Sequence, residues 1–437
     1  MIIASIAGFA CRDNPIGPDS GDLHLSAEDI GVTDLWLRVK IDESNELRTI
    51  TLTRDGQILF AVQYSALDTL ILCDSLLPRH TYKYTAILTG KNIFSTSYAE
   101  LTVTTLDTTT HDFTWEVDTL GDGANSSLRD VAIVNDTCVW AVGELYLRDS
   151  MGQFETEPYN AARWDGQAWH LLRVPTRIFG GSIATAPLTT VFGFSPSDIW
   201  VFSVAGSYSH WDGSAWSTEY VPERSGGGTK FWGTSSFNLF LVGTNGSITY
   251  YNGSTWQKME SGTDVDLLDV WGSPDGSVVW ACGYYRSRIG TYLLCYTGTT
   301  WEVAYDGTNS EFLIRTDSLS GAYSSVYTPS SNKIFVCTSA GIYSAPSRTR
   351  GEAKLISFPS TWSGFPWRLR GNAVNDVVLV GEYYMLGHFN GVAFKHYNEL
   401  GGYGRLASVY QRDNFVVAVG YSFDPIHSRG IVFRGRR

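Results

Sequence analysis

Short apolar segments alternate with polar residues along most of the chain, and turn residues separate them. In the first part, segments of this kind cover residues 35–40, 50–54, 58–64, 69–73, 82–88 and 99–105. Side chains that alternate with a period of two are typical of half-buried β-strands, and a signal such as Asp55-Gly56 is typical of a hairpin turn. The pattern therefore predicts an all-β chain.

An internal repeat organises the chain after residue 108. An apolar phrase, ended by glycine in most copies, occurs seven times, at residues 139–143, 199–202, 239–243, 279–283, 334–337, 377–381 and 416–420. A second repeated segment ends in Asp-Gly or Asn-Gly, a pair that supplies a two-residue hairpin turn. It occurs at residues 163–166, 210–213, 250–253 and 388–391. Repeats of about 40 to 60 residues with four short strands each resemble β-propeller blades. The resemblance implies a seven-bladed β-propeller with four-stranded blades over residues 108–437.

The two ends of the repeat region complement each other. The last copy ends near residue 435 without a fourth strand, whereas residues 114–117 (Thr-Trp-Glu-Val) stand before the first copy and are identical to residues 300–303, the fourth strand of another copy. We expect residues 114–117 to complete the last blade, a strand-swapped closure that removes a free sheet edge.

Residues 23–107 resemble a fibronectin type III domain. The sequence Leu-Leu-Pro-Arg-His-Thr-Tyr at residues 76–82 is similar to the Leu-x-Pro-x-Thr-x-Tyr corner of that family, with His80 in place of the threonine, and Trp36 stands where the family buries a tryptophan. The resemblance implies a β-sandwich with Trp36, Tyr82 and Tyr84 in its core and the Tyr82 hydroxyl bonded back to nearby backbone. A spacer role is expected for this domain.

Residues 1–22 resemble the end of a bacterial lipoprotein signal followed by a polar tether. Small and apolar residues lead to Cys11, which would be the lipidated residue, although no cationic segment precedes them. The alternative is an ordinary N-terminus with one stray cysteine. The resemblance implies a protein that is lipid-anchored in the bacterial cell envelope or secreted.

Charge and cysteine content narrow the possible partners. The net charge is −12, the pI is about 5.1, and the sequence has no basic stripe. These features argue against nucleic acid as a binding partner. No Cys/His cluster indicates zinc, and no spaced Asp/Asn pattern supports Ca²⁺, so no cofactor is expected. Cys282 and Cys295 lie on adjacent predicted strands and either form a disulfide or remain buried thiols.

The aromatic residues divide into two groups. Tryptophans at repeated positions, such as Trp140, Trp200 and Trp280, are expected to pack between blades. Other aromatic and polar residues interrupt the repeat in loops that should open on one face of the propeller. The candidate binding residues in these loops are Tyr146, Phe154, Glu155, Glu157, Tyr159, Tyr284, Tyr285, Arg286, Tyr383, Tyr384, Tyr421 and Phe423. The alternative is that they only cap the mouth of the channel.

These observations favour a non-catalytic binding protein. The sequence has no nucleophile elbow, P-loop, HExxH or dinucleotide fingerprint. We expect the loop-bearing face to recognise a glycan or an extracellular protein. The alternatives are a polysaccharide hydrolase or lyase that uses acids of residues 144–160, and an assembly platform.

Overall fold

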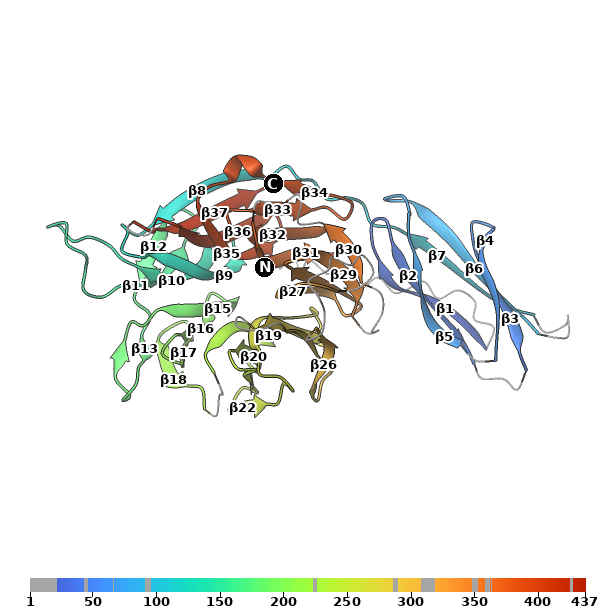
Figure 1. Cartoon of the computed structure of the whole chain (residues 1–437), viewed down its shortest axis with the longest axis horizontal. Helices are drawn as coiled ribbons and strands as arrows, with labels where there is room; N and C mark the ends of the chain where they lie inside the picture. Colours follow the sequence, from blue (N-terminus) through green and yellow to red (C-terminus); the bar gives the residue numbers. More distant parts are fainter. Residues whose placement is uncertain are drawn as a thin grey trace, which may run out of the picture. The chain divides into compact units, whose positions relative to one another are not determined.

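A computed structural model describes residues 22–42, 46–65, 67–90, 96–222, 226–285, 290–307, 319–347, 353–357, 362, 364–424 and 427–437. It divides into two compact units, Met1–Thr109 and Thr110–Arg437 (Figure 1). Apart from a short 3₁₀ helix at Asn398–Leu400, the described elements are β-strands, so the predicted all-β class is confirmed. None of the described residues forms a helix long and apolar enough to cross a lipid bilayer.

The first unit contains two antiparallel sheets. The three-stranded sheet has the order β1-β2-β5, and the four-stranded sheet has the order β4-β3-β6-β7. Alternate residues of both sheets face a shared core that includes Leu37, Leu52 and Leu88. The strands are β1 (Leu23–Ile30), β2 (Leu35–Ile41), β3 (Arg48–Arg54), β4 (Gln57–Tyr64), β5 (Leu67–Cys73), β6 (Thr81–Thr89) and β7 (Thr96–Thr104).

The expected tyrosine corner is present, but the expected buried tryptophan is not. Tyr82 and Tyr84 are buried, and the backbone N–H of Leu77 donates to the Tyr82 hydroxyl at 2.8 Å. Trp36, by contrast, is only half-buried. Its neighbours Leu35 and Leu37 occupy the inner face of β2, and strand alternation therefore turns Trp36 to the other face. The prediction that Trp36 belongs to the core was wrong.

In the second unit, the described residues form seven four-stranded antiparallel sheets. The first six follow the chain: β9 (Ser127–Asn135) to β12 (Trp169–Leu172), β15 (Leu188–Ser195) to β18 (Trp216–Tyr220), β19 (Gly228–Ser235) to β22 (Trp256–Met259), β23 (Asp266–Gly272) to β26 (Trp301–Asp306), β27 (Tyr323–Ser330) to β30 (Lys354–Ser357), and β31 (Pro366–Ala373) to β34 (Phe394–His396). The seventh joins β35 (Gly404–Arg412), β36 (Phe415–Ser422) and β37 (Gly430–Arg436) to β8 (Thr114–Leu120).

The seventh sheet contains the predicted strand exchange between the two ends of this unit. β8 pairs antiparallel with β37, with Val117 opposite Phe433 and Trp115 opposite Gly435. On the opposite face of this strand pair, the Arg434 side chain links β37 to β8. Its Nε donates to Asp118 at 2.6 Å, and its Nη2 donates to Glu116 at 2.7 Å. The prediction for residues 114–117 is confirmed.

The first strands of the seven sheets form a closed circuit. β9 contacts β15, each later first strand contacts the next, and β35 contacts β9 again. Between the sheets lie aromatic side chains: Trp140, Trp200 and Trp280 are buried, as their repeated positions predicted. Cys282 and Cys295 are buried free thiols, as are the other cysteines among the described residues.

Candidate functional site

The seven first strands place a polar residue at the same repeat position, directly before a buried apolar residue. Because these strands contact one another around the circuit, the polar side chains gather at the centre of the unit. The residues are Asp130, Thr190, Lys230, Asp269, Ser325, Arg368 and Ser408, and we call them the axial cluster.

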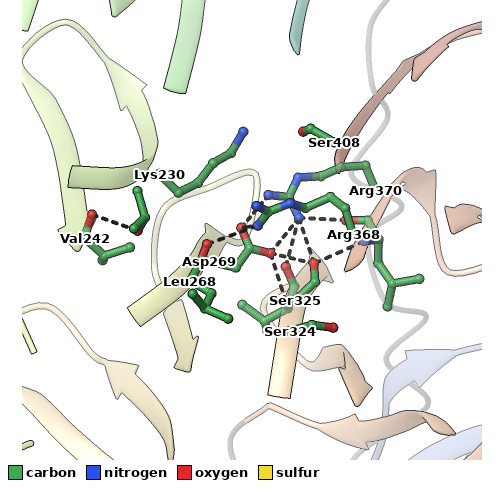
Figure 2. Close-up of polar contacts among 12 residues, drawn as sticks. Lys230, Val242, Leu268, Asp269, Ser324, Ser325, Arg368, Arg370 and Ser408 are labelled. Atoms are coloured by element: carbon green, nitrogen blue, oxygen red, sulfur yellow. Dashed lines mark hydrogen bonds and ion pairs between the residues drawn. The ribbon is translucent and has the colours of Figure 1, made fainter. Parts of the chain in front are cut away.

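Asp269 organises one half of the axial cluster (Figure 2). Arg370 makes a two-pronged contact with its carboxylate, at 3.0 Å from Nη1 and 2.7 Å from Nη2. Ser325 donates to Oδ2 at 2.5 Å, and Arg368 forms an ion pair with Oδ1. Burial alone would raise the pKa of Asp269, but the two guanidinium groups outweigh burial and lower this pKa to about 2. This carboxylate is therefore charged at neutral pH.

Asp130 organises the other half. Lys230 Nζ donates to both of its carboxylate oxygens, at 2.6 and 2.7 Å. The hydroxyls of Thr190 and Ser408 each donate at 2.7 Å. Between them, Asp130 and Asp269 connect all seven first strands. Both carboxylates are buried and occupied by donors, so this arrangement suits a structural clamp better than proton transfer.

The turn after β32 (Asp376–Gly381) meets the segment that precedes β35, and this contact creates a surface between two neighbouring sheets. Tyr383 N–H donates to Gly404 O at 2.6 Å, and Gly402 N–H donates to Tyr383 O at 3.1 Å. Arg405 Nη2 donates to Glu382 at 3.2 Å. The turn between the second and third strands of one sheet and the connection to the next sheet therefore lie side by side.

Aromatic rings and one arginine cover this surface, which we call the rim patch: Trp367, Tyr383, Tyr403, Arg405, Tyr421 and Phe423. The Phe423 ring is the hub, with ring centroids 6.1 Å from Tyr383, 5.4 Å from Tyr403 and 5.9 Å from Tyr421. The Arg405 guanidinium lies 4.2 Å from the centroid of Trp367. Tyr403 is 70% exposed and Tyr383 is 44% exposed.

Backbone strain marks the same place. Tyr383 and Tyr384 have φ values of 56° and 53°, and Met385 N–H closes the turn on Glu382 O at 3.0 Å. Two successive positive φ angles are the pattern of a type I′ turn, in which Asn-Gly is preferred. A bulky residue in this conformation costs about 1–2 kcal/mol. Strained backbone of this kind is found most often at functional sites, and the turn at Tyr383 and Tyr384 adjoins the rim patch.

A second group forms around the loop of residues 144–160. A pocket of about 450 Å³ is lined by Asp149, Phe154, Glu155, Thr156, Glu157 and Arg173. Arg173 forms an ion pair with the Glu155 carboxylate and stacks 4.0 Å from the ring centroid of Tyr159. Burial and a hydrogen bond to Glu144 raise the pKa of Tyr146 to about 12. The positive charge of Arg173 is thus already paired with Glu155, one of the acids that a hydrolase would need.

The structure sorts the predicted site residues into separate groups. Tyr383, Tyr421 and Phe423 meet in the rim patch, whereas Tyr146, Phe154, Glu155, Glu157 and Tyr159 belong to the loop of residues 144–160 and its pocket. Tyr384 packs against the buried Phe433, with ring centroids 5.5 Å apart. Tyr284 ends β24 of a different sheet, and Tyr285 follows it with its ring in contact with Tyr292. Arg286 and Cys11 lie outside the described residues.

Three rim-patch residues were not found from the sequence. Trp367 and Arg405 lie at the beginnings of first strands, and Tyr403 lies in the segment just before β35. A signal existed, because the two glycines before Tyr403, Gly401 and Gly402, mark a connection between sheets.

Across the described ranges, no three His, Cys, Asp or Glu side chains are grouped as a metal site would need.

Comparison with known proteins supports the fold class. No family model matches the chain, and no curated protein matches it. One similar solved structure is YCF48 bound to D1 peptide, at 15% identity and a TM-score of 0.52, covering 74% of this chain and 97% of that one. Another is YCF48 from Cyanidioschyzon merolae, at 13% identity and a TM-score of 0.51, covering 73% and 98%. Both are β-propellers, so the likeness supports a propeller-type fold.

Proposed function

We propose that residues 108–437, which include the second unit, form a seven-bladed β-propeller that binds a segment of a partner protein at the rim patch without catalysing a reaction. The seven four-stranded sheets and the closed circuit of first strands support the blade number. The observation that carries the functional proposal is an aromatic surface with two exposed tyrosines, Tyr383 and Tyr403, built on a strained turn at Tyr383 and Tyr384.

The composition of the rim patch suits a protein partner. Tyr, Trp and Arg are the residues enriched at energetically dominant positions of protein interfaces. Tyrosine provides a large contact area at a small cost in conformational entropy, and its hydroxyl can still bond to polar groups. The propeller in one of the similar solved structures is bound to a peptide, which favours a protein segment over a glycan as the ligand.

For the first unit we propose a spacer of the fibronectin type III kind over residues 23–107. Its sheet orders and the hydrogen bond of Leu77 N–H to the Tyr82 hydroxyl support this proposal. Attachment through Cys11 to a bacterial envelope, or secretion, remains the proposed location. It rests on the sequence of residues 1–22 alone.

The test is a screen of the full chain against a peptide array and a glycan array, followed by titration of each hit and analysis for products. We expect peptide hits whose affinity falls at least tenfold in Tyr403→Ala. Phe237→Ala is the matched control, because Phe237 is 69% exposed but lies in the turn between β19 and β20 (Asn238–Gly243).

Each outcome of the screen separates the hypotheses. Peptide hits that Tyr403→Ala weakens and Phe237→Ala leaves unchanged support the proposal. Hits on glycans alone would replace the protein partner by a carbohydrate, and altered products would establish an enzyme. Peptide hits that are insensitive to Tyr403→Ala would remove the rim patch as the site.

A further inference from the structure

Among the described strands of the first unit, one sheet edge is apolar, exposed and without a neighbouring strand. In the four-stranded sheet, β4 pairs with β3 on one side and forms the edge of the sheet on the other. Ile58 is 68% exposed and Val62 is 37% exposed, and Leu59 and Tyr64 are exposed as well. An exposed strand edge presents unpaired N–H and C=O groups to any other strand that can approach it.

The absence of charge distinguishes β4 from the other strands described in this unit. Each of those six strands contains at least one charged residue, namely Glu28, Arg38, Arg48, Asp68, Lys83 or Glu100. β4 reads Gln-Ile-Leu-Phe-Ala-Val-Gln-Tyr and has no charge and no proline. Charged residues and prolines are the usual protection of an edge strand against pairing with another chain.

The pairing register shows which part of β4 is regular. Leu52 lies opposite Phe60 and Thr53 lies opposite Ile58, so Leu59 is an extra, bulged residue. From Phe60 to Tyr64 the register with β3 is uninterrupted. These five residues therefore form the straight segment that can accept a further strand.

This segment is complementary to a second copy of itself. In an antiparallel pair centred on Val62, Phe60 lies opposite Tyr64 of the second copy, Ala61 lies opposite its Gln63, and Val62 lies opposite its Val62. Aromatic pairs directly across two strands are favourable, and no like charges meet anywhere along the pair. A partner recognised by charge would find no charged side chain on this strand.

We propose that this chain forms a symmetric dimer in which β4 of two copies pair antiparallel about Val62. The contact joins two four-stranded sheets into one continuous sheet, and the same surface is used on both copies. The dimer carries two propellers, so two linked rim patches would bind a multivalent partner with higher avidity. The dimer contact involves only the first unit. The dimer proposal can therefore be tested independently of the ligand of the second unit.

Cross-linking tests the register directly. Residues opposite each other in an antiparallel pair have Cα atoms about 4.5–5.5 Å apart, which lies within the range of a disulfide bond. Val62→Cys in the full chain should therefore yield a covalent dimer under mild oxidation. Thr102→Cys is the matched control, an exposed position on the opposite edge strand β7, and the unaltered chain gives the background.

Sedimentation of the full chain tests the dimer without a cross-link. We expect the unaltered chain to dimerise as its concentration rises and Val62→Lys to remain monomeric, because two like charges would meet at the centre of the pair. Tyr98→Lys on β7 is the control and should dimerise normally, while circular dichroism shows whether each variant is folded. A monomeric unaltered chain, a dimer that survives Val62→Lys, or no excess of covalent dimer in Val62→Cys would each overturn the proposal.

Discussion

At the scale of single residues, the turn at Tyr383 and Tyr384 is the least expected feature of the molecule. Two tyrosines occupy positions where φ is positive, and only glycine adopts that conformation without cost. Tyr384 gains burial against Phe433, whereas Tyr383 is 44% exposed and its ring packs against Phe423. A strained residue with a partly exposed ring is understandable if that ring contributes to binding.

This turn leads to a prediction about two substitutions at one position. Tyr383→Gly and Tyr383→Ala both remove the ring, but only glycine relieves the positive φ. We expect Tyr383→Gly to be more stable than Tyr383→Ala by about 1 kcal/mol, the reverse of the usual order in regular structure. Urea unfolding of the two variants measures the difference. Equal stabilities would show that the turn is not strained.

The Asp269 carboxylate leads to a second prediction. Asp269→Asn leaves Arg368 and Arg370 buried without their counter-charge, and loss of one partner of a buried pair costs about 3–5 kcal/mol. Unfolding followed by tryptophan fluorescence at pH 7 measures this cost. Asp136→Asn is the control, since Asp136 pairs with Arg436 on the surface and its loss should leave the melting temperature unchanged.

The same variant has a defined pH dependence. The pKa of Asp269 is lowered to about 2 in the folded state, against an ordinary value near 3.9. A lowered pKa contributes stability above the unfolded value, and the contribution is lost as the pH falls through the folded value. The stability difference between the unaltered chain and Asp269→Asn should therefore shrink between about pH 4 and pH 2. A difference that stays constant over this range would contradict the assignment.

At the scale of elements, β8 is the strand on which closure of the second unit depends. It supplies the outer strand of the seventh sheet although it precedes all the other strands of that unit. A chain that starts at Gly121 lacks β8, whereas a control chain that starts at Thr110 retains it. We expect the shorter chain to melt at least about 5 °C lower or to aggregate through the bare edge of β37. Identical melting curves would show that closure does not need this strand.

The sequence was most informative about elements and least informative about positions within them. Repeated phrases predicted the strands and the exchange of residues 114–117, because hydrophobic period and turn residues determine both. Trp36 was misplaced because a one-residue shift along a strand moves a side chain to the opposite face. The repeat did not predict the short hairpin of β13 (Thr176–Arg177) and β14 (Ile183–Ala184).

The candidate sites show the same limit. The axial cluster was missed because its seven polar residues differ in type from strand to strand, and only alignment of all seven strands reveals a common position. The rim patch was found in part, since aromatic residues in connecting loops are visible in the sequence. Its strained turn was not, because Tyr-Tyr is not a recognised signal for positive φ.

At the scale of the whole molecule, the proposed binding surface of the second unit uses other residues than the ion pairs at its centre. Buried ion pairs hold the first strands together at the centre, whereas the rim patch contains none of these ion pairs and exposes Tyr383 and Tyr403. Binding residues placed in connecting segments on a rigid scaffold are a common arrangement. The sharpest variants for function are therefore those at the rim, because they leave the central ion pairs intact.

Hydrogen exchange of the full chain, with and without the strongest peptide from the array, locates the binding surface on the protein. We expect the peptide to slow exchange in residues 382–385, 401–405 and 421–424, and to leave the turn at residues 235–238 unchanged. Protection confined to other segments, such as the loop of residues 144–160, would contradict the assignment of the rim patch as the binding site.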